Sequence, residues 1–213
     1  MIRLYDFPFS SAAYRVRIAL NLKGATYERT PINIAPGANE QLTEAYRLIN
    51  PQQKVPVIEV DGRIAGQSMA IIEWIDEMVP GPPLLPGAAW LRLQARAFAD
   101  TIACDIHPLN NLSPRAYLRD RLGVSEADGM AWYSHWITRG FQALEREAAA
   151  PRQTRYLFSD TPSIAEIALV PQVANARRFR VDITAFPALT ALDAICREHE
   201  AFRRAAPESA PPV

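Results

Sequence analysis

The sequence predicts two domains of different class, a small α/β domain followed by a larger all-helical domain. Short β-prone runs that alternate with helical patterns are confined to the first third of the chain. Helical spacing dominates the remainder, and a stretch rich in proline and glycine separates the two parts. A chain of 213 residues is long enough for two such domains, each with its own core.

The predicted elements of the first domain follow one another as βαβ, then α, then ββα. Strands are predicted at 2–5, 27–34, 55–60 and 63–66, and helices after Ser10-Ser11 as far as Lys23-Gly24, at 40–49 and from Gln67-Ser68 onward. Asp61-Gly62 between the last two strands is typical of a hairpin turn. This order predicts a mixed sheet with helices on its faces, which is the thioredoxin-like arrangement.

The domain boundaries follow from the breaks in these patterns. The first domain is predicted to span 1–79, and 80–88 is a linker whose prolines and glycines cannot continue a helix. The helical domain spans 89–204, with helices expected at 89–121, 125–148, 163–178 and 187–203, the third opened by the capping box of Ser163 and Glu166. The Pro- and Ala-rich residues 205–213 are expected to form a flexible tail.

Composition excludes several classes of function. Lys plus Arg equals Asp plus Glu at 23 each, and this balance argues against a general affinity for nucleic acid or an anionic membrane surface. Cys104 and Cys196 are far apart, which indicates a reducing cytoplasm instead of a disulfide framework. The histidines, His107, His135 and His199, show no metal-binding spacing, and we expect no metal. No signal peptide or membrane span is expected.

The first candidate for chemistry is Ser10-Ser11 at the predicted strand-to-helix turn. Backbone N–H groups at a helix N-terminus are unpaired and carry partial positive charge. A hydroxyl group there can donate a hydrogen bond to a thiolate and stabilise it. The structural alternative is that one serine only caps the helix.

Two further candidates lie in the same domain. A proline such as Pro56, placed before a strand in this arrangement, is often cis, which turns the backbone of Val55 outward to pair with an extended peptide. The alternative is a trans proline at the first residue of a strand. Gln67-Ser68 opens a helix whose free N–H groups suit a carboxylate, or it is again a simple cap. Together with Ser10-Ser11 these sites match the thiol, peptide and α-carboxylate of glutathione.

The helical domain offers two polar clusters. His107-Pro108-Leu109-Asn110-Asn111 interrupts the first long helix and forms either a pocket wall or a proline kink with solvated polar residues. The run from Arg177 to Arg180 ends a helix, where cations ordinarily complement the helix dipole. One of these arginines can instead hold a substrate carboxylate through two hydrogen bonds.

Five segments together resemble the zeta class of glutathione transferases, which includes maleylacetoacetate and maleylpyruvate isomerases. They are the signature from Ser10 to Leu20, Asn50-Pro51 with Val55-Pro56, Gln67 to Glu73, Ile106 to Ser113, and Leu169 to Phe179. The resemblance extends from residue 2 to about 204, and the serine pair and the Leu-Val-Pro-Gln segment are its most class-specific parts. It implies the glutathione-transferase fold, a homodimer and glutathione as coenzyme.

The resemblance also implies a set of site residues. Ser10 and Ser11 would stabilise the thiolate, and Arg178, with Arg177 second, would bind the substrate carboxylate. The implied glutathione-binding residues are Ser10, Ser11, Ala12, Ala13, Tyr14, Arg15, Gln41, Val55, Pro56, Gln67, Ser68, His107, Asn111, Leu112 and Ser113.

The chain departs from the class at three places. Many relatives carry a cysteine where Ala12 stands and an arginine where Phe9 stands. Maleylpyruvate isomerases carry a further arginine near Leu112-Ser113, and we expect none there. A second thiol is therefore not essential here, and fewer arginines are available to hold a dicarboxylate.

The resemblance implies a glutathione-dependent cis–trans isomerase of a maleyl keto acid, in aromatic amino acid or aromatic acid catabolism. The thiolate would add to the double bond and leave after rotation. One alternative is a general transferase that conjugates or dehalogenates small electrophiles. Another is a binding module without catalytic activity, since fold alone does not establish activity.

Overall fold

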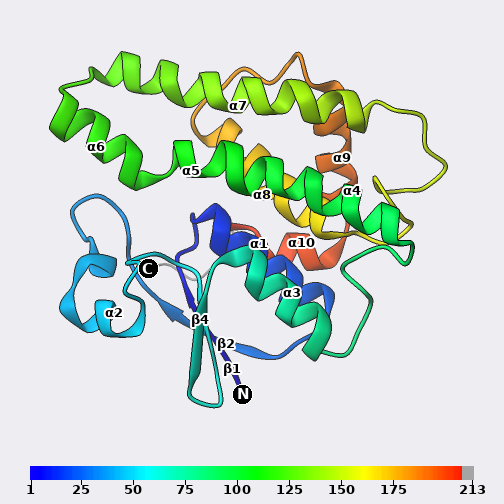
Figure 1. Cartoon of the computed structure of the whole chain (residues 1–213), viewed down its shortest axis with the longest axis horizontal. Helices are drawn as coiled ribbons and strands as arrows, with labels where there is room; N and C mark the ends of the chain where they lie inside the picture. The colour runs from blue at the N-terminus through cyan, green and yellow to red at the C-terminus, as the bar shows by residue number, and fades with distance from the viewer. Residues whose placement is uncertain (208–213) are drawn as a thin grey trace. The chain divides into compact units, whose positions relative to one another are not determined.

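The computed structural model describes residues 1–207, which form two compact units. Of the described residues, the first unit contains 1–84 together with 197–207, and the second contains Leu85–Cys196. Figure 1 follows the elements along the chain by colour, from the blue strand β1 to the red helix α10. The predicted fold class, a thioredoxin-like α/β domain plus an all-helical domain, is confirmed.

The sheet of the first unit has four strands in the order β2-β1-β3-β4. These are β1 (Ile2–Asp6), β2 (Tyr27–Pro31), β3 (Val57–Val60) and β4 (Arg63–Gly66). Strand β1 pairs parallel with β2 and antiparallel with β3, and β3 pairs antiparallel with β4. The mixed sheet is as predicted, but β2 ends three residues early, and β3 begins after the Val55–Pro56 bond instead of at it.

Helices of the first unit are α1 (Ser11–Leu22), the 3₁₀ turn η1 (Glu40–Leu42), α2 (Glu44–Ile49), α3 (Ser68–Met78) and α10 (Glu200–Ala205). The single helix predicted at 40–49 divides at Thr43, because the Thr43 hydroxyl accepts from the Tyr46 N–H and starts a new helix. Helix α1 packs against α3 and α10. Its buried side chains include Val16, Ile18 and Leu20, which belong to the core.

The last helix, α10, corrects the predicted end of the helical domain. The helix expected at 187–203 ends at Arg197, and α10 begins after His199, whose ring nitrogen caps it by accepting from the Ala201 N–H at 3.1 Å. Asn21 of α1 donates to the Ala201 carbonyl at 3.0 Å. The chain from Arg197 to Ala205 therefore belongs with the first unit, and most of the predicted tail, 208–213, lies outside the described residues.

The second unit is helical throughout its regular structure. Its elements are α4 (Ala89–Asp100), the π-helical segment η2 (Thr101–Ile106), α5 (His107–Asn110), α6 (Leu112–Leu122), α7 (Glu126–Ala148), α8 (Ile164–Arg178) and α9 (Pro187–Arg197). The capping box at Ser163 and Glu166 is present as predicted.

The helix expected at 89–121 is interrupted twice. Pro108 has no N–H to donate to the preceding turn, and the helix ahead of it widens into the π segment. Asn111 then adopts an extended conformation and caps α6 through its side chain. The packing is tight here, since a Cβ on Gly140 of α7 would lie 2.3 Å from Ile106. The helix is therefore interrupted around Pro108, as in the second alternative considered for the His107 segment, but Asn110 is buried and not solvated as that alternative expected.

Candidate functional site

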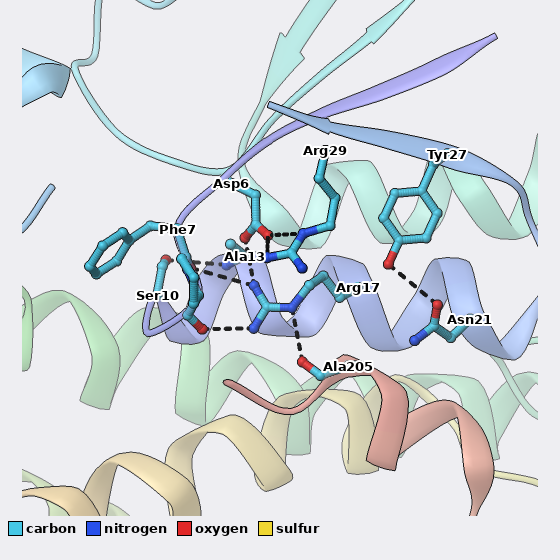
Figure 2. A network of polar contacts seen from close by, with 10 residues as sticks. Asp6, Phe7, Ser10, Ala13, Arg17, Asn21, Tyr27, Arg29 and Ala205 are labelled. Atoms are coloured by element: carbon cyan, nitrogen blue, oxygen red, sulfur yellow. Dashed lines mark hydrogen bonds and ion pairs between the residues drawn. The ribbon is translucent and has the colours of Figure 1, made fainter. Parts of the chain in front are cut away.

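The serine pair lies at the start of α1, as the sequence predicts. Ser10 is the N-cap, and its Oγ accepts a hydrogen bond from the Ala13 N–H at 3.3 Å (Figure 2). Ser11 is the first helical residue and is 4 % exposed. Capping uses only a lone pair of the Ser10 hydroxyl, so its proton remains available to a further acceptor. The capping role and the thiolate-stabilising role are compatible.

A direct hydrogen bond joins the serine-pair helix to the second predicted site. The Arg15 Nη1 donates to the Ser68 Oγ at 3.3 Å, and both residues are buried. Ser68 opens α3, whose N-cap Gln67 has φ of 70° and ψ of 107° and makes no side-chain cap. This φ is costly for a residue with a side chain, and such strained positions gather at ligand sites.

The predicted peptide-binding segment has two notable features. The Val55–Pro56 bond is cis, the first of the two alternatives considered for it. Nearby in sequence, the Gln41 Oε1 of η1 is buried and accepts no hydrogen bond within residues 1–207. Buried polar atoms are nearly always paired in native proteins. An orphan acceptor of this kind fits a ligand that brings an N–H group.

The rest of the signature is largely core. Ala13 and Tyr14 are buried, and Arg17 lies 5.2 Å from the centre of the Tyr14 ring. Ala12 is half-buried. The side chains of Ala13 and Tyr14 therefore support the helix, and only their backbone groups remain as ligand contacts.

In the second unit, the two polar residues predicted around Pro108 have different settings. His107 is half-buried at the start of α5. The Asn111 side chain accepts from the Leu112 N–H at 2.7 Å, so it caps α6. Asn110 belongs to the same predicted cluster but not to the implied binding residues. It is 6 % exposed, and neither side-chain polar atom is paired within the described chain. Leu112 and Ser113 are exposed.

Arg115 corrects the expectation that no arginine stands near Leu112-Ser113. It lies on α6, with its guanidinium carbon 5.1 Å from the Tyr133 ring centre and 4.8 Å from the Phe179 ring centre. The two rings are 4.6 Å apart. Burial raises the pKa of Tyr133, and the charges of Arg115 and Arg178 oppose this. Arg115 stands two residues after Ser113 in the sequence, and its contacts with the two rings make it a candidate.

The two arginines predicted at the end of α8 have different contacts. Arg177 pairs with the buried carboxylate of Asp193 on α9. Arg178 is exposed and lies 5.6 Å from the Phe179 ring centre. Phe179 thus contacts two guanidinium groups, from Arg178 and Arg115. Both charges also act on the hydroxyl of Tyr133, whose pKa they lower.

Two further features are absent from residues 1–207. No group of three or more His, Cys, Asp or Glu side chains there is arranged to hold a metal ion. No described helix is both long and apolar enough to cross a membrane.

Comparison with known proteins places these features in a family. Residues 4–83 match the family model described as glutathione S-transferase, N-terminal domain. Maleylpyruvate isomerase from Ralstonia sp is 47% identical over 99% of both chains. A holo structure of a maleylpyruvate isomerase, described as a zeta-class bacterial glutathione transferase, has a TM-score of 0.93 at 47% identity and covers 98% of each chain.

A second solved structure is similar at lower identity. Maleylacetoacetate isomerase from Methylobacterium extorquens AM1, with bound malonate and glutathione, is 32% identical with a TM-score of 0.93. The match covers 99% of this chain and 100% of that one. Similarity of this extent, together with the serine-pair turn, the cis Val55–Pro56 bond and the Gln67-Ser68 helix start, shows that the chain belongs to the zeta class of glutathione transferases.

Proposed function

We propose that this protein is a glutathione-dependent cis–trans isomerase of maleylpyruvate or maleylacetoacetate, acting in the breakdown of aromatic compounds. The observation that carries the proposal is the Arg15–Ser68 hydrogen bond, which ties the serine-pair turn to the Gln67-Ser68 helix start. Two sites predicted separately thereby form one rigid region. Full-length similarity to isomerases supports the reaction type.

The residues of the first unit fit glutathione. The unpaired Gln41 Oε1 and the buried Val55 segment suit its peptide groups, and the N-terminus of α3 beside Ser68 suits its α-carboxylate. Residues Ser10 to Arg15 would surround the sulfur. When bound, glutathione supplies a thiolate that adds to the activated double bond and later leaves, so that the intervening bond can rotate.

The chain's own contribution to this chemistry is electrostatic. The Ser10 hydroxyl, already polarised by accepting from the Ala13 N–H, would donate to the thiolate, with Ser11 as the second donor. The open N–H groups of the first turn of α1 add positive potential. Both effects lower the pKa of the bound thiol and raise the fraction of reactive thiolate.

The substrate is a dicarboxylate, and the second unit offers two cations for it. We assign Arg178 to one carboxylate, in preference to Arg177, which is held by Asp193. Arg115 is the second cation, and no carboxylate within residues 1–207 pairs with it. The aromatic ring of Phe179, which both guanidinium groups approach, would limit water access and strengthen both interactions.

The experiment that tests this function is a set of three assays on the purified protein. We expect maleylpyruvate or maleylacetone to isomerise with glutathione present in catalytic amount and recovered unchanged. Conjugation of chloronitrobenzene without isomerisation would establish a transferase instead. Retention on immobilised glutathione without any turnover would identify a binding module.

One observation favours the general transferase as second candidate. Phe9, beside the serine pair, is 47% exposed and stacks edge-on against Phe7, with ring centres 5.9 Å apart. An aromatic surface at this position suits an uncharged electrophile better than a dicarboxylate. Comparing kcat/KM for the two substrate types decides between the candidates.

We further propose a homodimer in the cytoplasm. Within the second unit, Trp90 and Leu93 of α4 are 69% and 53% exposed, which is unusual for large apolar side chains and is consistent with a covered face. Sedimentation of the wild-type protein and of Trp90→Glu is the test, and a wild-type monomer would contradict the dimer.

A further inference from the structure

A buried guanidinium lies directly behind the serine-pair turn. Arg17 of α1 is 1% exposed, and it donates to three different elements of the first unit (Figure 2). Its Nη1 donates to the Asp6 Oδ1 at 2.5 Å, its Nη2 to the Pro8 carbonyl at 2.8 Å and its Nε to the Ala205 carbonyl at 2.9 Å. A longer contact of 3.4 Å reaches the Phe7 carbonyl.

These acceptors make Arg17 the main anchor of the turn that precedes Ser10. Within the turn itself, the only backbone hydrogen bond among the described residues is from the Ser10 N–H to the Phe7 carbonyl at 3.0 Å. Arg17 holds the carbonyl groups on either side of the Phe7–Pro8 bond in fixed directions. The planar five-donor guanidinium can do this while also binding Asp6, which the point-like ammonium of lysine cannot.

The same carboxylate has a second cation that does not contact the turn. Arg29 of β2 binds the Asp6 Oδ2, with its Nη2 at 2.5 Å and its Nε at 2.6 Å. Within the described chain, the side-chain hydrogen bonds and ion pairs of Arg29 are all to Asp6, and none is to residues 7–10 or to α10. Arg29 therefore shares the ion pair of Arg17 and lacks its positioning contacts, which makes it a matched control.

We propose that Arg17 is a positioning residue for thiolate stabilisation, because it fixes the Phe7–Ser10 turn and so directs the Ser10 hydroxyl toward the glutathione sulfur. The proposal rests on the proposed function in assuming that glutathione binds at Ser10. The hydrogen bond from Arg17 to the Ala205 carbonyl extends this control to α10, so that the last described helix supports the turn.

The test compares Arg17→Lys with Arg29→Lys, both of which preserve net charge. The thiolate absorbance of bound glutathione is titrated against pH, and melting temperature and the glutathione Kd are measured in parallel. We expect Arg17→Lys to raise the thiol pKa of bound glutathione by about 0.5–1 unit. At pH values below the wild-type pKa, the fraction of thiolate then falls about three- to tenfold. We expect Arg29→Lys to lower the melting temperature while leaving the thiol pKa within about 0.2 unit of wild type.

The outcomes separate this inference from the proposed function, since the titration requires no substrate. A wild-type protein that binds no glutathione would overturn both. A wild type with a lowered thiol pKa that Arg17→Lys does not alter, or that both variants alter equally, would overturn the positioning role alone.

If Arg17→Lys does not fold, the full-length variant Phe202→Ala replaces it, because it loosens the packing of α10, which carries the Ala205 acceptor, and retains Arg17 and Asp6. Its thiol pKa is expected to rise in the same direction by a smaller amount. An unchanged thiol pKa in the folded variant would contradict the proposed support from α10.

Discussion

The Arg15 guanidinium and the Ser68 hydroxyl lie 3.3 Å apart in the interior of the first unit, although 53 residues separate them in the chain. Arg15 lies in the second turn of α1, and Ser68 is the first residue of α3. We assign the N-termini of both helices to glutathione binding. Because the hydrogen bond is buried, the two helix starts hold a constant spacing. That spacing determines which tripeptide fits between a sulfur site and a carboxylate site.

Ser68 is expected to bind glutathione without taking part in the chemistry. Replacing it with alanine removes a hydroxyl and weakens glutathione binding by about 1–2 kcal/mol, or roughly 5- to 30-fold in Kd. Turnover at saturating glutathione should change little, the pattern expected for a loss of uniform binding. Ser68→Thr retains the hydroxyl and is the control. A large fall in saturated turnover with unchanged Kd would contradict this role.

The two serines are expected to differ in stability effects. Ser10→Ala removes the cap on Ala13 and should lower the unfolding free energy by about 1 kcal/mol, whereas Ser11→Ala removes no cap. The serine that donates to the thiolate should, on substitution, raise the thiol pKa by about one to two units. Because the thiolate is the reactive form, turnover is then lost at low pH and recovers above the new pKa. If neither substitution moves the titration curve, both hydroxyls are structural only.

Arg178 and Arg115 are expected to act on charged substrates selectively. Arg178→Ala should weaken transition-state binding of maleylpyruvate or maleylacetone by about 2–4 kcal/mol, which lowers kcat/KM about thirty- to a thousandfold. It should have little effect on kcat/KM for chloronitrobenzene. Arg115→Ala should give a loss of the same kind. Arg119→Ala is the control, since Arg119 lies on the same helix and pairs with exposed Asp120.

Arg177→Ala should behave differently from these variants. It disturbs the ion pair with buried Asp193, so we expect a loss of about 1–3 kcal/mol in unfolding free energy and similar small effects on both substrates. Equal effects of Arg178→Ala on charged and neutral substrates would instead make Arg178 an ordinary helix-end cation.

Glu166 is expected to be the most important cap of the second unit. Its carboxylate is fully buried and accepts from the Leu157 N–H at 2.9 Å and the Ser163 N–H at 2.8 Å. Glu166→Ala leaves both donors unsatisfied and should cost about 2–4 kcal/mol in urea unfolding. Glu166→Gln keeps one acceptor and should cost less.

The pH dependence of these variants has a definite sign. Burial raises the pKa of Glu166 above its ordinary value of 4.5, so the folded state binds this proton more tightly than the unfolded state. Tighter proton binding by the folded state contributes to the free energy of unfolding at low pH. The wild type loses this stabilising contribution as the pH rises from 4.5 through the raised pKa, and Glu166→Gln, which does not titrate, does not. The stability difference between them should narrow with rising pH, and a difference that widens would contradict it.

Local signals in the sequence were sufficient for most of the fold. The Asp61-Gly62 hairpin, the capping box at Ser163 and the start of α1 at Ser10-Ser11 each depend on residues within a few positions of one another. The same applies to the interruption at Pro108, whereas the π-helical segment before it packs Ile106 closely against Gly140 of a distant helix. Neither that segment nor the end of α6 follows from helical spacing alone.

The parts that could not be predicted depend on contacts between distant residues. Arg177 and Arg178 are equivalent in sequence, and only the position of Asp193 on α9 distinguishes them. Arg115 became a candidate through the rings of Tyr133 and Phe179. The amino-acid sequence of α10 does not indicate that this helix packs on α1, because apolar spacing alone does not say which unit a helix packs against.

The location of α10 also bears on how the protein is made. The first unit takes residues from both ends of the described chain, and residues 85–196 are synthesised between them. At ribosomal rates that interval lasts about 6–22 s. Throughout it, Arg17 has been translated and its acceptor at Ala205 has not. The turn before Ser10 thus acquires the Arg17–Ala205 hydrogen bond only after the second unit has been synthesised, so the first unit cannot complete its native contacts before the end of translation.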